Sequence, residues 1–237
     1  RKLIVEPPLS SLTIFFPCYN DEGTIDELVV DAIAVGYGLT DDLEVIVIDD
    51  GSRDGSRRLL EMLRTKHSEL RLVCHEKNLG YGAALRSGFD AAAKEWVFYT
   101  DGDGQYDVND LEDLVAESAS ADIVNGHKIK RSDSWVRRLI GKAYATAVRK
   151  AFDLPVRDID CDFRLIRTTL VKQLDLKSDS GSICVELIVG LDGPGAVFCE
   201  VPVHHYARRF GKSEFFQFSR ILRTIYQLFK LHKRSGR

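Results

Sequence analysis

The stretch Trp-Val-Phe-Tyr-Thr-Asp-Gly-Asp-Gly-Gln, residues 96–105, joins an apolar run to two acids one residue apart. The apolar run is typical of a buried strand. Asp101 and Asp103 stand at positions i and i+2, so in extended backbone their side chains share a face. Two carboxylates on one face repel each other unless a cation lies between them. Because carboxylate oxygens suit Mg²⁺ or Mn²⁺, this stretch predicts a metal-diphosphate site at the carboxyl edge of an α/β sheet.

Two simpler interpretations of the same residues compete with a metal-diphosphate site. Acids and glycines after a strand are ordinary turn formers. Residues 101–112 also place oxygen-bearing side chains at positions 1, 3, 5, 7, 9 and 12 of a calcium loop. However, Tyr106 stands where that loop requires glycine, and a strand rather than a helix leads into it. The calcium loop is therefore disfavoured.

The alternation of apolar runs with segments of helical period predicts the fold class. Five apolar runs lie at residues 12–16, 44–48, 70–74, 96–99 and 122–125. The helical segments that follow them begin at about residue 24 and then cover 55–67, 81–94, 108–118 and 135–152. This alternation indicates parallel βαβ units in a doubly wound α/β sheet. Beyond residue 152 the pattern predicts only a short helix near 184–191 and a strand at 196–203.

The bulk properties limit the kind of protein. With 237 residues, 44% hydrophobic and 29% charged, the chain is long enough for one large α/β domain. Its net charge of −3 gives no indication of nucleic-acid binding. Five scattered cysteines without a C-x-x-C pair fit reduced thiols in a cytosolic setting better than a disulfide framework or a zinc site. No uncharged run reaches transmembrane length, so we expect any membrane contact to be at the surface.

Two stretches are basic in spite of the overall charge. Between His127 and Lys150 there are eight lysines and arginines and one acid, Asp133. Such a run is most often a solvated helix face. The second stretch is the tail after Glu214, which has six more bases and no acid.

At 3.6 residues per turn, the tail forms an amphipathic helix. Its apolar arc consists of Phe215, Phe218, Ile221, Leu222, Ile225, Tyr226, Leu228 and Phe229, and its polar arc of Arg220, Arg223, Gln227, Lys230 and Arg234. A stripe of this kind most often packs on its own domain. Bases without acids, together with many aromatics, instead favour an anionic membrane surface. We therefore expect a catalytic domain over residues 1–214 and a membrane-surface helix over 215–237.

The loops after four consecutive predicted strands are polar or rich in glycine. They read Pro-Cys-Tyr-Asn-Asp-Glu at 17–22, Asp-Asp-Gly-Ser-Arg-Asp-Gly at 49–55, Lys-Asn-Leu-Gly-Tyr-Gly at 77–82 and Asp-Gly-Asp at 101–103. Parallel strands carry such loops to the same edge of a sheet. A nucleotide pocket is therefore a better interpretation than four unrelated turns.

Each loop offers a group suited to one part of a nucleotide. Asp49 and Asp50 can accept hydrogen bonds from a base or ribose, and Tyr19 can cover a base plane. Lys77 can form an ion pair with a phosphate. The Gly80-x-Gly82 pair opens a helix whose N-terminal N–H groups favour anions.

The same glycines are also similar to the dinucleotide-binding fingerprint. In that interpretation Leu85 occupies the third glycine position, where it is too large for close helix–strand contact. The motif also follows the third predicted strand rather than the first. A hydride-transfer enzyme, moreover, does not need Asp101 and Asp103, so the dinucleotide site is disfavoured.

Together these motifs resemble those of the family-2 glycosyltransferases of GT-A fold, and most of all the dolichyl- and polyprenyl-phosphate sugar synthases. Residues 156–164 resemble that subfamily's R-D-x-x-x-G-F-[RK] segment. Residues 200–203, Glu-Val-Pro-Val, and 209–213, Arg-Phe-Gly-Lys-Ser, resemble its late E-V-P-V…R-x-G-x-S stretch. The resemblance covers nearly the whole chain and implies a Rossmann-like, mixed and mainly parallel sheet flanked by helices.

The resemblance implies an inverting transfer of a sugar from a nucleotide-diphosphate sugar (GDP-mannose or a UDP-hexose) to a polyprenyl or dolichyl phosphate, with Mg²⁺ or Mn²⁺. With the residues named above, the expected nucleotide-sugar site comprises Pro17, Tyr19, Glu22, Asp49, Asp50, Ser52, Lys77, Gly80, Gly82 and Lys212. The implied metal ligands are Asp101, Asp103 and Gln105. The implied catalytic residues are Asp103, Asp158, Asp160 and Arg209, of which Arg209 closes over the donor together with Lys212. The acceptor phosphate is expected at Lys128, Arg131, Arg137 and Arg138.

The chemistry fits a lipid-phosphate acceptor. Such a phosphate is already anionic at neutral pH, so it needs no strong general base, unlike a sugar hydroxyl. The enzyme must instead neutralise two anions, and a metal and a basic helix supply that charge. Two alternatives stay open: a family-2 transferase acting on a sugar hydroxyl, and a nucleotide-sugar-binding paralogue of weak activity.

Two residues depart from the subfamily's pattern. Asp162 stands where relatives usually have glycine, and Cys184 where an acid is common; either can alter acceptor choice. We expect a cytoplasmic protein, peripheral on the inner face of a membrane. Its expected partners are a nucleotide-diphosphate sugar and a lipid phosphate, and no nucleic acid.

Overall fold

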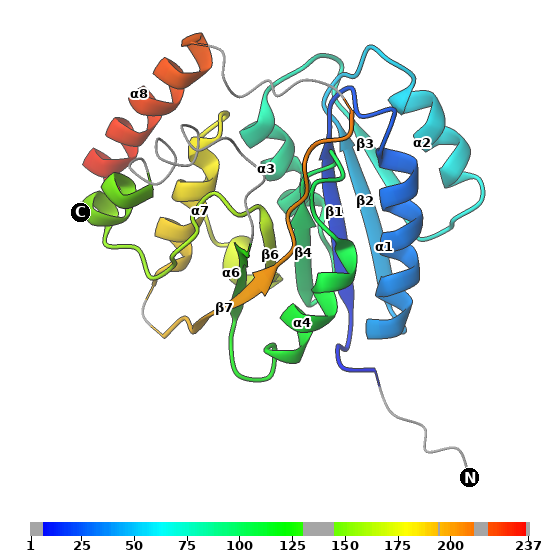
Figure 1. The fold of residues 1–237 in the computed structure, drawn as a ribbon, viewed down its shortest axis with the longest axis horizontal. Helices are drawn as coiled ribbons and strands as arrows, with labels where there is room; N and C mark the ends of the chain where they lie inside the picture. Colours follow the sequence, from blue (N-terminus) through cyan, green and yellow to red (C-terminus); the bar gives the residue numbers. More distant parts are fainter. Residues whose placement is uncertain (1–6, 130–144, 194, 211–217, 236–237) are drawn as a thin grey trace.

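The computed structural model describes residues 7–129, 145–193, 195–210 and 218–235. Its centre is a seven-stranded sheet of order β3-β2-β1-β4-β6-β5-β7 (Figure 1). The strands are β1 (Leu12–Cys18), β2 (Leu43–Asp49), β3 (Leu70–Cys74), β4 (Trp96–Thr100), β5 (Ile123–Lys128), β6 (Phe163–Arg167) and β7 (Phe198–Val203). The helices are α1 (Ile25–Leu39), α2 (Ser56–Arg64), α3 (Tyr81–Ala91), the 3₁₀ turn η1 (Val108–Asp110), α4 (Leu111–Ala116), α6 (Thr168–Val171), α7 (Ser182–Leu191) and α8 (Phe218–Ser235). Residues 145–152 are also helical.

The sheet is mixed and mainly parallel, as predicted. β1 pairs in parallel with β2 and β4, β2 with β3, and β5 with β7. Among the described strands, only β6 runs the other way, antiparallel to β4 and β5 on its two sides. The alternation of apolar runs does not predict β6, because Arg164 and Arg167 interrupt its apolar pattern.

Alternating residues of the strands face two layers of helices. In β1, Ile14 and Phe16 pack with residues of α1 and α4 in one hydrophobic cluster. Phe15 faces the other way and packs with residues of α3 and α7. Its ring lies so close to α3 that a Cβ at Gly88 would be 2.8 Å from Phe15 Cζ, which explains the glycine. Both faces of the sheet are thus covered, as expected of βαβ units.

The carboxyl ends of the parallel strands meet at one edge of the sheet. The strands end there at Cys18, Asp49, Cys74, Thr100, Lys128 and Val203. Because β6 is antiparallel, it begins at this edge, with Phe163 opposite Thr100. The loop before β6 and the loop after β4 therefore enter the same region. In open α/β sheets this is the edge at which ligands bind.

α8 lies beside α7 and packs on the domain through one side only (Figure 1). Leu231 is buried against the domain, with 5% of its surface exposed. Four apolar side chains of α8 face solvent, with exposed fractions of 51% for Leu222, 57% for Ile225, 62% for Tyr226 and 57% for Phe229. We call these four residues the exposed stripe of α8. The tail thus contacts its own domain, while four of the five side chains of its predicted apolar arc that the structure describes stay exposed.

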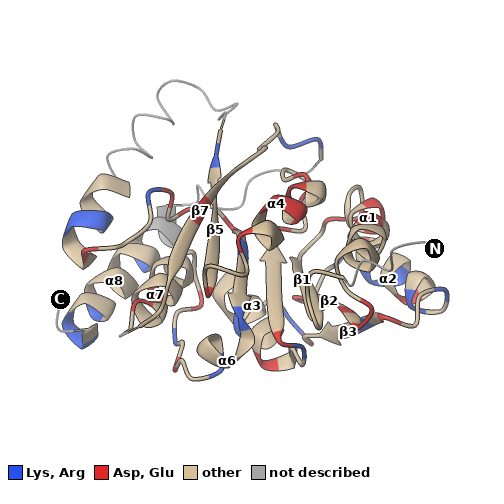
Figure 2. Ribbon diagram, turned by 90° about the horizontal axis from the view of Figure 1, so that it is seen from below, with Lys and Arg blue, Asp and Glu red and all other residues tan. Residues whose placement is uncertain are grey.

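Charge is unevenly spread over the elements. Figure 2 shows Lys and Arg along α8, and Asp and Glu over α4 and α1. The last turn of α8 carries His232, Lys233 and Arg234, where bases are favoured by the helix dipole. No helix in the described parts of the chain is long and apolar enough to cross a membrane.

Candidate active site

Asp101 and Asp103 lie in a tight turn directly after β4. Gly102 packs against the end of β1, where a Cβ would be 2.6 Å from the Pro17 carbonyl oxygen. Gly104 has φ +69°, a conformation that favours glycine. The Gln105 N–H donates to Asp103 Oδ1 at 3.0 Å. The two acids are thus held at the sheet edge by their own turn.

Both carboxylates have polar partners from other elements. The Tyr81 hydroxyl, at the start of α3, donates to Asp101 Oδ1 at 2.8 Å. Arg208, after β7, forms an ion pair with Asp103. Burial raises the pKa of Asp101 well above its usual range, and the negative charges of Asp162 and Asp103 add to the shift. Burial also raises the pKa of Asp103, although Arg208 opposes this.

The residues of this turn fit a divalent cation. A cation between two buried carboxylates offsets the cost of burying their charge. In the part of the chain that the structure describes, no group of three or more His, Cys, Asp or Glu side chains is arranged as a metal site. Two carboxylates are enough for Mg²⁺ or Mn²⁺, which take further ligands from water and phosphate. The Gln105 amide nitrogen donates to the Tyr206 carbonyl at 3.0 Å, so its amide oxygen is the atom left for a cation.

Asp21 is a carboxylate of this site that the sequence motifs do not single out. Its Oδ2 accepts from the Tyr19 N–H at 3.0 Å, and its own N–H donates to Ser56 Oγ at 3.0 Å. A Cβ at Gly102 would lie 3.5 Å from Asp21 Oδ2, so the side chain lies beside the turn. Burial raises the pKa of Asp21 to about 6; the Tyr19 N–H opposes the shift and the Asp103 charge adds to it.

We expect Asp21→Asn to stabilise the fold at neutral pH. The folded pKa of about 6 exceeds the usual aspartate pKa of 3.8, so the folded protein holds this proton more tightly than the unfolded chain does. The resulting stability is fully present below the unfolded pKa and is lost as the pH rises through the folded pKa. Asparagine avoids the loss, which is on the order of 3 kcal/mol.

Urea unfolding between pH 4 and pH 8 without added metal tests this expectation. The stability difference between Asp21→Asn and wild type should grow across that window. Asp26→Asn, an exposed acid at the start of α1, is the control. A difference that stays constant with pH would contradict the raised pKa of Asp21.

The two acids at the end of β2 accept hydrogen bonds from the backbone of two turns of this chain. Asp49 is 0% exposed; it accepts from the Ser52 N–H at 2.9 Å and pairs with Arg57. It therefore has no surface left for a base or ribose, and the structure assigns it to the turn at Ser52. Asp50 accepts from the N–H groups of Leu79 and Gly80 at 2.8 and 3.0 Å. It holds the glycine turn before α3, and its contact with a nucleotide stays a prediction.

Gly80 and Gly82 are required by close backbone contacts. Gly80 has φ +101°, and a Cβ there would be 2.5 Å from the Asp179 carbonyl oxygen. A Cβ at Gly82 would be 2.7 Å from Asp179 Cα. The Gly82 N–H donates to the Asp179 carbonyl at 3.2 Å. α3 therefore begins in contact with the segment before α7, and its first residue, Tyr81, reaches the carboxylate turn.

The other predicted nucleotide residues on the described loops lie at the same edge, at least partly exposed: Tyr19, Glu22, Ser52 and Lys77. Glu22 Oε2 accepts from the Gly55 N–H at 2.9 Å. Ser52 Oγ accepts from the Asn20 N–H at 3.1 Å. These two bonds join the loop after β1 to the loop after β2. Lys212 lies outside the described residues.

Lys128, at the end of β5, lies among the acids before β6. Its N–H donates to Asp158 Oδ2 at 3.2 Å, and its amine donates to the Asp160 carbonyl. Burial alone would lower the pKa of Lys128, but neighbouring charges, Asp158 first among them, raise it above its usual value. Its positive charge partly opposes the rise in the pKa of Asp101, so a fixed cation faces the carboxylate turn. The other predicted phosphate ligands lie outside the described residues: Arg131, Arg137 and Arg138.

Arg164 on β6, the last residue of the segment that resembles the subfamily motif, is a buried anchor of the sheet. It is 0% exposed. Its guanidinium donates to the Tyr99 hydroxyl on β4, to Asn125 Oδ1 on β5 and to the Ile159 carbonyl. Asp162 Oδ1 lies 3.4 Å from it. The segment that resembles the subfamily motif is thus tied to the middle of the sheet by its arginine.

The two residues that depart from the subfamily's pattern are in contact. Cys184 Sγ donates to Asp162 Oδ1 at 3.0 Å. Burial raises the pKa of the Cys184 thiol well above its usual value, and the Asp162 charge adds to the shift. The thiol therefore stays protonated and can donate. The two departures form one pair beside the carboxylate turn rather than two separate changes.

The segment after β7 crosses the site and places one of two adjacent arginines in it. The Tyr206 N–H donates to the Gln105 carbonyl at 2.7 Å. Arg208 reaches the second carboxylate of the turn. Arg209, implied by the resemblance to close over the donor, has a side chain that is 68% exposed and lies 4.0 Å from Glu27. Its predicted role stays a prediction, while Arg208 is the arginine found in contact with the turn.

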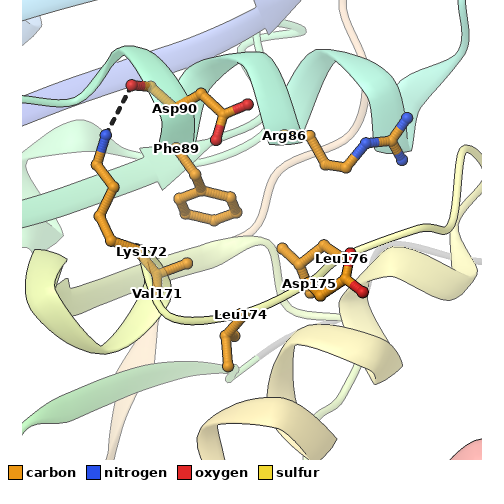
Figure 3. A pocket seen from close by; sticks show the side chains of 8 residues that line it. All are labelled: Arg86, Phe89, Asp90, Val171, Lys172, Leu174, Asp175 and Leu176. Carbon is orange, nitrogen blue, oxygen red and sulfur yellow. Dashed lines mark hydrogen bonds between the residues drawn. The ribbon is translucent and has the colours of Figure 1, made fainter.

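A separate cavity of about 320 Å³ lies between α3 and the segment that includes and follows α6 (Figure 3). Its apolar sides come from Phe89, Val171, Leu174 and Leu176. Lys172 donates to the Asp90 carbonyl at 2.6 Å at one end of it. None of the predicted site residues lines this cavity, so it is not part of the candidate active site.

Comparison with known families and structures identifies the family and the fold. The family described as glycosyl transferase family 2 matches residues 13–175, more than half of the chain. Glucosyl-3-phosphoglycerate synthase from Mycobacterium tuberculosis in complex with Mn²⁺, UDP-glucose and phosphoglyceric acid is 19% identical, with a TM-score of 0.73 over 94% of this chain and 80% of that chain. The same enzyme with Mg²⁺ and UDP is 20% identical, with a TM-score of 0.69 over 92% of this chain and 79% of that chain. At such identities the likeness establishes the fold.

Proposed function

Because the chain belongs to glycosyl transferase family 2 and is a glycosyltransferase that uses a nucleotide sugar, we propose that it is an inverting enzyme whose acceptor is a polyprenyl or dolichyl phosphate. The donor on this proposal is GDP-mannose or a UDP-hexose. The observation that carries the choice of a lipid acceptor is the exposed stripe of α8. A soluble acceptor gives no reason for four large apolar side chains to face solvent on one helix.

On the donor side, Asp101 and Asp103 would hold a Mg²⁺ or Mn²⁺ ion, with Gln105 beside them. The ion supplies positive charge to the donor diphosphate. The burial of both carboxylates and their raised pKa values support this assignment. Arg208 adds a cation of the chain's own at the same place.

On the acceptor side, Lys128 holds the phosphate, together with the predicted ligands Arg131, Arg137 and Arg138. Asp158 and Asp160 fix Lys128 through its N–H and its amine. Because the acceptor phosphate is already anionic, no strong base has to remove a proton from it. The residues of this side instead reduce the repulsion between two anions that must approach each other.

The exposed stripe of α8 brings the enzyme to its lipid. Lys230 and Lys233 border it, with their amines 5.8 Å from the centre of the Tyr226 ring and 4.7 Å from that of Phe229. α8 contains no acid. Apolar and aromatic side chains bordered by bases suit the interface of an anionic membrane. On this proposal the protein is peripheral on the cytoplasmic face of a membrane.

An acceptor assay tests the proposal. The protein is incubated with Mn²⁺ and either UDP-glucose or GDP-mannose, and with either a polyprenyl phosphate or 3-phosphoglycerate. We expect a glycosylated lipid phosphate with one of the donors. Product from 3-phosphoglycerate alone would reject the lipid acceptor but keep the glycosyltransferase. No product with either acceptor would favour a different hydroxyl acceptor or a paralogue of weak activity.

We also expect the double variant Ile225→Ser/Phe229→Ser to bind anionic liposomes at least about tenfold more weakly than wild type. Burying one such side chain contributes about 1.5–3 kcal/mol. Even partial burial of the two side chains in the interface therefore changes the affinity for liposomes by more than about tenfold. Sedimentation with phosphatidylserine-containing vesicles measures the change. Met62→Ser, which removes an apolar side chain 49% exposed on α2, is the control and should bind as wild type does. Equal binding by the double variant would mean that α8 does not contact the membrane.

A further inference from the structure

The segment just before α7 connects α8 to the glycine turn of the donor site. Both carboxylate oxygens of Asp179 are engaged by α8: Oδ2 pairs with Arg223, and Oδ1 accepts from Gln227 Nε2 at 2.5 Å. Gln227 Oε1 accepts from the hydroxyls of Ser180 and Ser182 at 2.6 and 2.7 Å. α8 therefore docks here through polar side chains.

A second anchor keeps this segment in place from the other side. The Glu186 carboxylate on α7 accepts from the Ser178 N–H at 2.7 Å and pairs with Arg234 of α8. Glu186 is 3% exposed. Arg86 of α3 donates to the Ser178 carbonyl. Residues 178–182 are thus fixed between α3, α7 and α8.

The backbone of Asp179 meets the donor side. Its carbonyl oxygen accepts from the Gly82 N–H. The same oxygen would lie only 2.5 Å from a Cβ at Gly80, which is too close for any side chain there. Asp50 in turn accepts from the Gly80 N–H at 3.0 Å. Asp50 and the backbone of Asp179 therefore both contact the glycine turn, and Tyr81, which follows it as the first residue of α3, donates to Asp101.

We propose that Asp179 is a positioning residue of the donor site. By binding the Asp179 carboxylate, α8 holds the glycine turn in place. This inference rests on the proposed function of the turn in binding the nucleotide sugar. Asp179 acts through its backbone carbonyl, which sets the start of α3. Loss of its contacts with α8 frees the carbonyl to move, and the turn loosens with it. The helix that meets the membrane is then coupled to donor affinity.

Two variants remove the contact from either side: Asp179→Asn on the segment and Arg223→Gln on α8. Asp175→Asn is the matched control, because it also removes a carboxylate from an ion pair of the same segment, but its partner Lys177 is not on α8. Calorimetry measures the Kd of UDP and of GDP in the presence of Mn²⁺. We expect each variant to weaken binding of the recognised nucleotide about fivefold or more, and the control to leave it unchanged. The double variant should be no weaker than either single one, since both act through one contact.

Hydrogen exchange of residues 79–85 is a readout that does not depend on nucleotide binding. It should become faster in both variants and stay as in wild type in the control, while β1 stays protected in all of them. Steady-state rates should show a raised KM for the donor with an unchanged KM for the acceptor, and Arg223→Lys should restore most of the donor affinity. If wild type binds neither nucleotide, the proposed function fails while hydrogen exchange still decides the coupling. Unchanged Kd values with a nucleotide that wild type binds, or unchanged exchange, would overturn the inference.

Discussion

Asp103→Asn is expected to lower the rate of sugar transfer on the order of 10³-fold or more. The substitution keeps the shape of the side chain and removes one of the two charges that the turn offers to a divalent cation. It also removes the anionic partner of Arg208. The divalent cation and Arg208 therefore both lose the carboxylate that would hold them beside the donor diphosphate. Nucleotide release from the donor in the presence of the acceptor measures the rate.

The same variant should stay folded. Burial raises the pKa of Asp103, so burying its ionised form costs the folded protein some stability. A neutral asparagine avoids that cost, and the melting temperature without metal should equal or exceed that of wild type. Asp107→Asn is the control, because asparagine can keep the cap that Asp107 gives to the Asn109 N–H. A wild-type rate in Asp103→Asn, or full wild-type activity in EDTA, would rule out the metal assignment.

Arg164→Met is expected to cost about 3–5 kcal/mol of unfolding free energy, which is typical when one partner of a buried charged network is removed. Methionine fills much of the same space but donates no hydrogen bond. The Tyr99 hydroxyl, Asn125 Oδ1 and the Ile159 carbonyl each lose a donor. A buried polar group left without a partner costs about 1–3 kcal/mol, so the three losses together account for the size of the effect.

Arg167→Met, on the same strand, separates this effect from the loss of any arginine. Arg167 pairs with Glu95 at the surface, and its guanidinium lies 4.2 Å from the centre of the Trp96 ring. Exposed pairs and cation–π contacts of this kind contribute no more than about 1 kcal/mol each. Urea unfolding of both variants gives the comparison. Losses of equal size would mean that the network around Arg164 is not what stabilises the centre of the sheet.

The strand–helix alternation is enough to predict the parallel part of the sheet and the edge where its loops meet. It does not predict β6, because a strand with two arginines has no continuous apolar run. Arg164 is buried only because Tyr99, Asn125 and Ile159 supply its acceptors, and two of these lie on other strands. Contacts between residues so far apart leave no local pattern to recognise.

The site shows the same limit at the level of single residues. The pair Asp49-Asp50 is recognisable as part of a nucleotide loop, but its pattern does not say that Asp49 is enclosed by Ser52 and Arg57. In the tail, the helical period predicts two arcs but not which one docks. Which arc docks depends on the side chains near Asp179 that bind the polar side of α8. Those side chains lie outside α8, so its helical period does not reveal them.

β5 and β6 lie side by side with Asn125 opposite Arg164, so the chain between them leaves and re-enters the sheet at one edge. A connecting segment whose two ends lie on paired strands can change in length at low entropic cost. Each doubling of its length adds only about 0.6 kcal/mol to the free energy of loop closure. The strands that carry the donor loops, β1 to β4, come before it in the chain. On the proposed assignment of the two sides, evolution can exchange the acceptor side as a replaceable insert while the donor side is inherited intact. One sheet can in this way come to serve different acceptors.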